Sequence, residues 1–120
     1  MSARGEGTIR ARDREVQILF TNRALAQAEQ AMGKSTIAVT QGFLNGAAGI
    51  GDLAHLLQAG MEAARRDSGE RGRVVTTRDA YNVLDEAGFT AVTQVVMEAV
   101  AAVLSYGADV NGDGEDADPN

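Results

Sequence analysis

Residues 16–35 read VQILFTNRALAQAEQAMGKS, and within this stretch an extended segment gives way to a helix. Apolar and polar side chains alternate at its start, as in a half-buried strand. Thr21 or Asn22 can cap the helix, because a side-chain oxygen there accepts hydrogen bonds from the free N–H groups of the first turn. Gly33 can take the left-handed conformation that ends it. The stretch therefore predicts that strands precede helices along this chain.

A β-hairpin is predicted upstream, over residues 7–21, with its turn near residues 12–15. Apolar side chains share one face of each strand: Ile9 and Ala11 on the first, Val16, Ile18 and Phe20 on the second. Two strands alone are marginal in water. Their apolar face is therefore expected to pack on helices or to pair with another chain.

Five helices are predicted after the hairpin, at residues 22–32, 35–44, 53–66, 78–87 and 90–106. Apolar residues recur in them at three- and four-residue steps, which is the spacing of a helix with one buried face. Candidate caps stand at the helix starts, namely Ser35, Asp52 and the pair Thr76-Thr77. Gly88 and Gly107 are the expected stops of the last two helices.

Two of these helices carry more specific expectations. In the second helix, Ile37, Phe43 and Leu44 are the candidate contacts with the rest of the protein. In the third helix, Gly60 lies inside the apolar stripe, where glycine costs up to ~1 kcal/mol relative to alanine. Close approach of another backbone is the expected reason for a glycine at this position.

The fold class expected from these elements is α+β, mostly α: an N-terminal β-hairpin followed by a compact bundle of about five helices. Residues 1–107 form one domain, and residues 108–120, which carry five acids and no base, form a disordered acidic tail. Twenty-one of the 120 residues are Ala, so the core is thin. A thin core is a mild argument for a partner or for self-association.

Charge and composition exclude several classes of function. The formal net charge is −6, and no basic face is concentrated enough for nucleic-acid binding. Arginines at positions 4, 10, 12 and 14 alternate with acids, so they form either the solvated face of the hairpin, which is the expected reading, or a patch for an acidic partner. The N-terminus lacks the apolar core of a secretory signal, and no apolar run reaches membrane-spanning length. A soluble, cytoplasmic protein without a membrane partner is expected.

Catalytic chemistry is not predicted. His55 is the only histidine, the chain has no cysteine, and no nucleophile has a plausible base, so neither an active site, a metal site nor a cofactor is expected. His55 itself is expected at the surface or an interface. Residues 109–114 match the start of a calcium loop, but Asn120 stands where a bidentate Glu is required. A plain acidic tail is therefore preferred over weak Ca²⁺ binding.

The order of these pieces resembles the small tail assembly chaperones of phages and gene transfer agents, which are sometimes described as tail tube proteins. The matching segments are the hairpin running into FTNRAL (20–25), EQAMGKS (29–35), DLAHLLQAG (52–60), and VLDEAG (83–88) before a long Ala-rich helix. Together they span about residues 7–107. The hairpin turn departs from the pattern because it lacks glycine, and the acidic tail is a further departure.

The resemblance implies a non-enzymatic role in building a long tail. Such a protein is expected to bind the tape-measure protein, to keep its helices from aggregating, and to help recruit tail tube subunits. Candidate anchors for a partner helix are Leu53, Leu56, Leu57, Val96 and Val103, although a plain core position is the preferred interpretation of each. The alternatives are a tail tube or minor tail component retained in the virion, and a small helical regulator that binds another protein.

Overall fold

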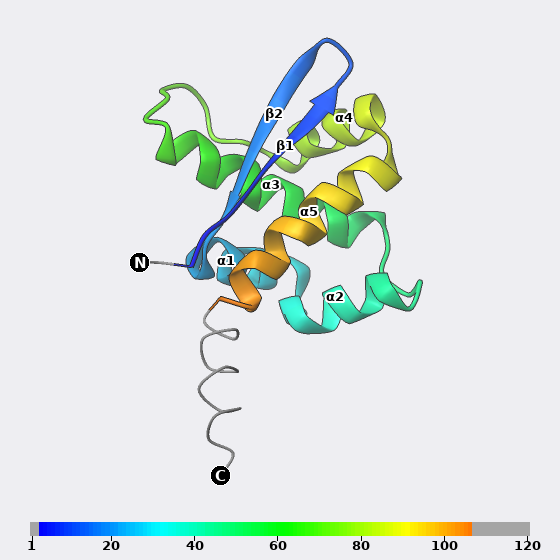
Figure 1. Ribbon diagram of the computed structural model, residues 1–120. Helices are drawn as coiled ribbons and strands as arrows, with labels where there is room; N and C mark the ends of the chain where they lie inside the picture. Colours follow the sequence, from blue (N-terminus) through cyan, green and yellow to red (C-terminus); the bar gives the residue numbers. More distant parts are fainter. Residues whose placement is uncertain (1–2, 107–120) are drawn as a thin grey trace.

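The computed structural model describes residues 3–106 as a β-hairpin with five helices packed against it (Figure 1). The elements are β1 (Gly5–Ala11), β2 (Arg14–Phe20), α1 (Asn22–Met32), α2 (Thr36–Leu44), α3 (Ile50–Asp67), α4 (Thr77–Ala87) and α5 (Phe89–Leu104). The predicted fold class, α+β and mostly α with the hairpin first, is confirmed. The expected tail at 108–120, its calcium-loop alternative and the stop at Gly107 lie outside the described residues.

The hairpin is antiparallel and turns on two residues. Gly5 pairs with Phe20 at the open end, and Ala11 pairs with Arg14 next to the turn. Arg12 takes the left-handed conformation, with φ of 54°, that a two-residue turn requires. The turn forms without the usual glycine, and β1 begins two residues before the predicted hairpin.

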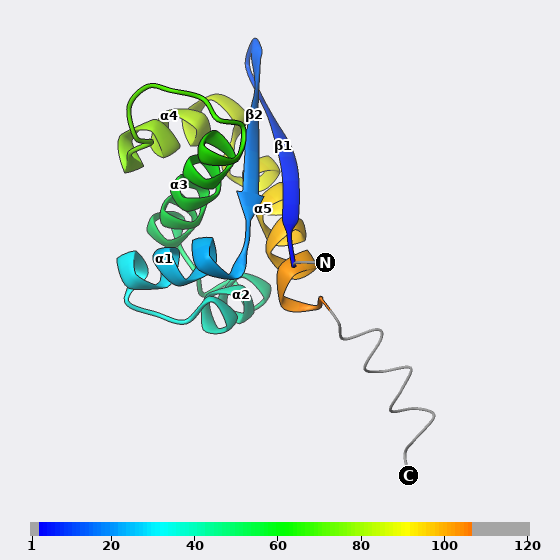
Figure 2. The same cartoon turned by 90° about the vertical axis from the view of Figure 1, so that its left-hand side faces the viewer.

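Helices of the same chain cover the apolar face of the hairpin, so the expected packing of strands on helices is confirmed. β2 packs mainly on α3 and β1 mainly on α5, and Figure 2 shows α3 running beside β2 and α5 running beside β1. Glycines let α5 approach the backbone of β1. A Cβ at Gly5 would collide with the carbonyl oxygen of Ala99, and a Cβ at Gly7 would lie 2.7 Å from Cγ1 of Val95.

Gly60 allows a second close contact, between α3 and β2. A Cβ there would lie 2.7 Å from Cζ of Phe20 and 3.2 Å from Cβ of Ile18. Both side chains are fully buried. The expectation of another backbone close to Gly60 is therefore wrong: the close neighbours are side chains on the buried face of β2.

Side-chain caps define most of the helix ends as predicted. Thr21 Oγ1 accepts a hydrogen bond from the Ala24 N–H, and Ser35 caps α2 in the same way. Thr76 and Asp79 form a capping box on α4. The predicted cap at Asp52 is wrong, because α3 starts at Ile50 and Asp52 lies in its first turn. There its carboxylate pairs with Lys34 at 2.9 Å.

Candidate partner-binding surface

The second helix, α2, is attached to the body of the protein by one side only. Its buried residues are Thr36 and Val39. The Thr36 N–H donates to the Glu29 carboxylate of α1 at 2.7 Å. At the other end of α2, Phe43 meets Phe89 of α5, with ring centroids 6.4 Å apart. These contacts leave the opposite side of α2 open to solvent.

The open side of α2 carries large apolar side chains. Ile37 is 60% exposed and Leu44 is 82% exposed. They are seven residues apart, two helical turns, so they lie on the same side of the helix with Gln41, also exposed, between them. The expectation that Ile37 and Leu44 contact the rest of the protein is wrong. Phe43, in contrast, packs against the core as expected.

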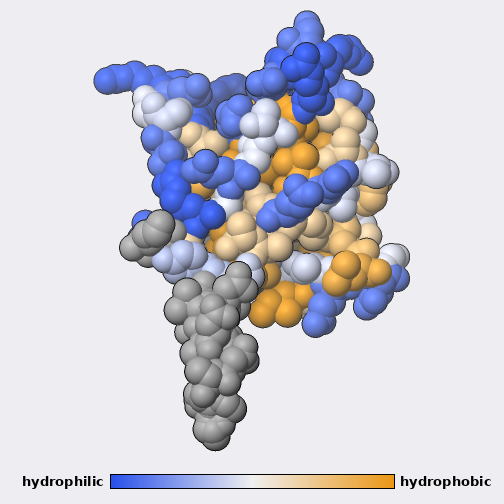
Figure 3. Space-filling model, in the orientation of Figure 1, coloured by the Kyte–Doolittle hydropathy of each residue, from blue (hydrophilic) through white to orange (hydrophobic). Residues whose placement is uncertain are grey.

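The segment that carries this side is itself free of charge. Residues 36–51 contain no charged residue, and the segment ends next to the Lys34–Asp52 ion pair. Ile50 is 57% exposed and Phe89 is 41% exposed. We call the exposed side chains of residues 36–51, together with Phe89, the uncharged surface. In Figure 3 apolar side chains gather over α2 and along α5, while charged ones gather at the hairpin tip and the α3–α4 loop.

None of the five candidate anchors lies on this surface. The side chains of Leu53, Leu56, Leu57, Val96 and Val103 are all buried in the core. They hold α3 and α5 together with the hairpin, so in this conformation they are core and offer nothing to a partner. The exposure of Ile37 and Leu44 was not predicted, because the spacing of apolar residues identifies the apolar face of a helix but not what packs against that face. The signal that marks them is the uninterrupted absence of charge over residues 36–51.

The charged half of the molecule is organised around a buried carboxylate. Glu62 is 5% exposed and accepts hydrogen bonds from Arg65 and Arg66, and from the Val75 N–H at 2.9 Å. The pKa of Glu62 is lowered to about 2, chiefly by the hydrogen bond from Arg65. Burial of the carboxylate acts in the opposite direction but is the smaller effect. Gln58 donates to the Val75 carbonyl. Together these bonds fasten the segment before α4 to α3.

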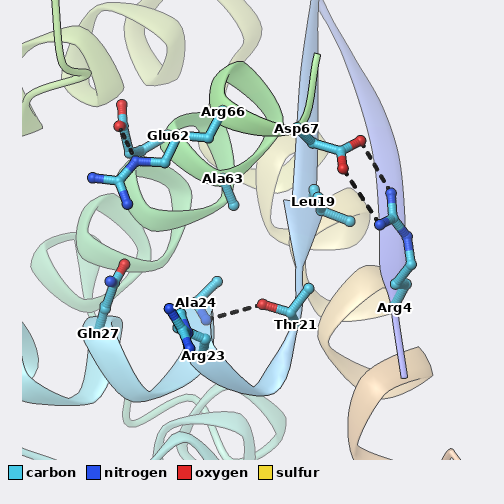
Figure 4. Close-up of a pocket in the computed structure, with 10 residues that line it drawn as sticks. All are labelled: Arg4, Leu19, Thr21, Arg23, Ala24, Gln27, Glu62, Ala63, Arg66 and Asp67. Atoms are coloured by element: carbon cyan, nitrogen blue, oxygen red, sulfur yellow. Dashed lines mark hydrogen bonds and ion pairs between the residues drawn. The ribbon is translucent and has the colours of Figure 1, made fainter. Parts of the chain in front are cut away.

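A hollow of about 280 Å³ lies beside this cluster, between β2, α1 and α3 (Figure 4). Its carboxylates are already engaged by arginines. Arg4 pairs with Asp67 at 3.2 Å, and Arg66 pairs with Glu62 at 2.8 Å. A carboxylate held ionised by arginine is a poor proton acceptor. The hollow therefore has the chemistry of a structural ion-pair cluster and not that of an acid–base site.

The hairpin arginines are solvated, as expected. The side chains of Arg10 and Arg14 are 78% and 50% exposed, and they pair with Glu15 and Glu86. Arg4 differs because its partner Asp67 belongs to α3, so its ion pair joins the hairpin to a helix. Three of the four hairpin arginines, Arg4, Arg10 and Arg14, already face a carboxylate of this chain, which disfavours a patch for an acidic partner.

His55 does not lie at a reactive site. It is half-buried, and its Nδ1 is enclosed without a hydrogen-bond partner. Within residues 3–106, no group of three or more His, Cys, Asp or Glu side chains is placed to hold a metal ion. The main surface features of the described residues are thus an apolar surface and a set of ion pairs.

Comparison with known proteins assigns no family. No model of a known protein family, no curated protein and no solved structure matches this chain. Over the described part of the chain, no single helix is long and apolar enough to cross a membrane. Helices α4 and α5 reach that length and apolarity only when taken together, and they are bent by 118° at their junction.

Proposed function

We propose that this protein is a non-enzymatic tail assembly chaperone, which binds helical segments of a phage-type tape-measure protein and helps recruit tail tube subunits to it. The observation that carries the proposal is the uncharged surface, where Ile37, Leu44 and Ile50 are each more than half exposed. Large exposed apolar side chains grouped in one segment are typical of a surface that binds a partner. The residue pattern shared with tail assembly chaperones supplies the kind of partner.

The binding mode is that of an amphipathic helix laid against an apolar face. Ile37 and Leu44 stand two turns apart, about 10 Å, which matches the spacing of apolar residues at i and i+7 on a partner helix. Burying a Leu or Ile side chain contributes roughly 1.5–3 kcal/mol when it is fully covered. A few such side chains support reversible binding, as a chaperone that must later release its client requires.

The hairpin supports a chaperone over a tail tube subunit. Tail tubes are expected to close through β-pairing between subunits, which calls for a sheet larger than one hairpin. In the described residues the sheet has two strands, and its apolar face is covered by α3 and α5 of the same chain. A structural component of the finished tail remains the alternative outcome of the test.

Co-expression with a tape-measure protein, which the proposal expects to be encoded downstream of this chain, tests the proposal. We expect the partner to become soluble and to co-purify with the wild-type chain. The double variant Leu44→Asp, Ile50→Asp is expected to abolish co-purification, because it places charge in the apolar contact. Both side chains are mostly exposed, so the fold is retained.

The control is Val74→Asp, which places one such charge on a 52% exposed apolar residue of the α3–α4 loop, outside the uncharged surface. This variant is expected to co-purify like the wild type. Purified tails are expected to contain little of the chain. Stoichiometric presence in finished tails would assign it instead to the structure of the tail.

A further inference from the structure

We propose that, in the free protein, a second copy of this chain covers the uncharged surface, with α2 of one copy packed antiparallel against α2 of the other about a two-fold axis near Gln41. This inference goes beyond the proposed function and does not depend on it. In a two-fold contact both copies use the same surface patch. If residue i of one copy contacts residue j of the other, then residue j of the first copy also contacts residue i of the second. The residues on the open side of α2 suit such an arrangement.

The pattern on that side reads almost the same in both directions. Ile37, Gln41 and Leu44 present an apolar side chain, an amide and an apolar side chain, at steps of four and three residues. An antiparallel copy that places Ile37 opposite Leu44 at both ends puts the axis between residues 40 and 41, so the two Gln41 side chains lie about 1.5 Å along the helix from facing each other directly. A side-chain amide both donates and accepts, so two glutamines can satisfy each other across the axis.

Charge also favours a second copy as the occupant. If a partner placed charged side chains against residues 36–51, those side chains would lose their hydration. They would gain no ion pair in return, because this segment has no charged residue. A second copy brings an equally uncharged face. Lys34 and Asp52, which flank this segment in the sequence, neutralise each other at 2.9 Å, and the Glu29 carboxylate of α1 accepts a hydrogen bond from the N–H of Thr36, which is buried. The ion pairs of the hairpin and the α3–α4 loop lie on other elements, so they do not oppose the contact.

The size of the contact sets its strength. The nine residues of α2 form a helix only about 13 Å long. A contact centred on it falls among the small interfaces, below about 1,200 Å² in total, which are weak and transient. We therefore expect a dissociation constant on the order of 10–100 μM. A dimer of this strength leaves the surface available to a stronger-binding partner.

Sedimentation velocity on the full chain, from about 5 to 500 μM, tests this directly. The wild type is expected to shift from monomer to dimer across the range. Leu44→Asp is expected to weaken the dimer by roughly tenfold or more, because it buries an unpaired charge. Val74→Asp, which adds the same charge elsewhere, is expected to dimerise as the wild type does.

A charge-swap experiment tests the two-fold axis itself. Gln41→Glu and Gln41→Lys are each expected to weaken self-association, because like charges meet at the axis. An equimolar mixture of the two variants is expected to restore dimers, because opposite charges then meet. A wild type that stays monomeric at 500 μM, or a mixture no better than the single variants, would overturn the proposal. Co-purification with the tape-measure protein is scored separately, so either idea can fail while the other stands.

Discussion

At the scale of single residues, Gly60 shows how little space separates α3 from β2. Phe20 and Ile18 occupy the room that any larger side chain would need. We expect Gly60→Leu to lower the free energy of unfolding by about 1–3 kcal/mol, as overpacking of a close-packed core does. Chemical denaturation measures the change.

Gly51 provides the control for that experiment within the same helix. A Cβ there meets nothing within 4 Å. We therefore expect Gly51→Ala to be neutral or to stabilise by up to ~1 kcal/mol, because alanine is the better helix former. A harmless leucine at position 60 would contradict the contact with Phe20.

Glu62 makes stability depend on pH in a definite direction. Its pKa is lowered from 4.5 to about 2, so its contribution is complete above pH 4.5 and is lost as the pH falls through this range. Glu62→Gln removes a charged acceptor from two arginines and is expected to cost about 1–3 kcal/mol at pH 7. The difference in the free energy of unfolding between the wild type and Glu62→Gln should shrink as the pH falls from 5 to 2.

Urea denaturation at a series of pH values measures that difference. Glu15→Gln is the control, because Glu15 also pairs with an arginine but is 54% exposed. Exposed pairs contribute roughly 0–1 kcal/mol, so this variant is expected to follow the wild type closely. Parallel pH curves for wild type and Glu62→Gln would show that the buried carboxylate does not stabilise the fold.

At the scale of elements, the packing of β1 against α5 depends on Gly5 and Gly7, which face different kinds of atoms on α5. A Cβ at Gly5 meets a backbone carbonyl, which can move only with its helix, whereas a Cβ at Gly7 meets a side-chain methyl group of Val95. We expect Gly5→Ala to destabilise by about 3 kcal/mol and Gly7→Ala by about 1 kcal/mol. Thermal unfolding of the two variants should preserve this order, and equal losses would contradict the difference.

Local sequence determines where most elements begin and end, and for this reason those boundaries could be predicted. Thr21, Ser35 and Thr76 cap the helices that follow them through bonds within three residues. The start of α3 was missed because Gly49 precedes it without a side-chain cap. The exposure of α2 was not predictable from spacing, since apolar residues occur on both of its sides. Only the packing distinguishes Val39, which is buried, from Leu44, which is not.

At the scale of the whole molecule, charge is segregated from the apolar surface. Residues 36–51 have no charge, while ion pairs join the hairpin, α3 and the start of α4. Self-association through an uncharged face should respond to salt as a hydrophobic contact does. Sulfate is expected to strengthen it, because excluded salts favour apolar burial. Sedimentation at several sulfate concentrations measures this, and weakening by salt would indicate a charge-driven contact instead.

The last residues of the chain differ from the rest in their charge. Deleting residues 108–120 removes five acids and takes the formal net charge from −6 to −1. We expect the melting temperature to stay within a few degrees, because so acidic a segment has little apolar area to bury. Differential scanning calorimetry with and without millimolar Ca²⁺ checks this. A loss of ten degrees, or a calcium-dependent rise in the full chain alone, would contradict it.

The packing of β1 on α5 also governs how the chain can fold while it is being synthesised. About 77 residues separate the end of β1 at Ala11 from the start of α5 at Phe89. At a synthesis rate of about 5–20 residues per second, the first strand waits roughly 4–15 s for the helix that covers it. During that interval the glycine-lined face of β1 is bare, and a nascent chain that stalls before α5 carries a hairpin in which only β2 can be covered, by α3. Docking of α5 is thus the step that ends this vulnerable period on the ribosome.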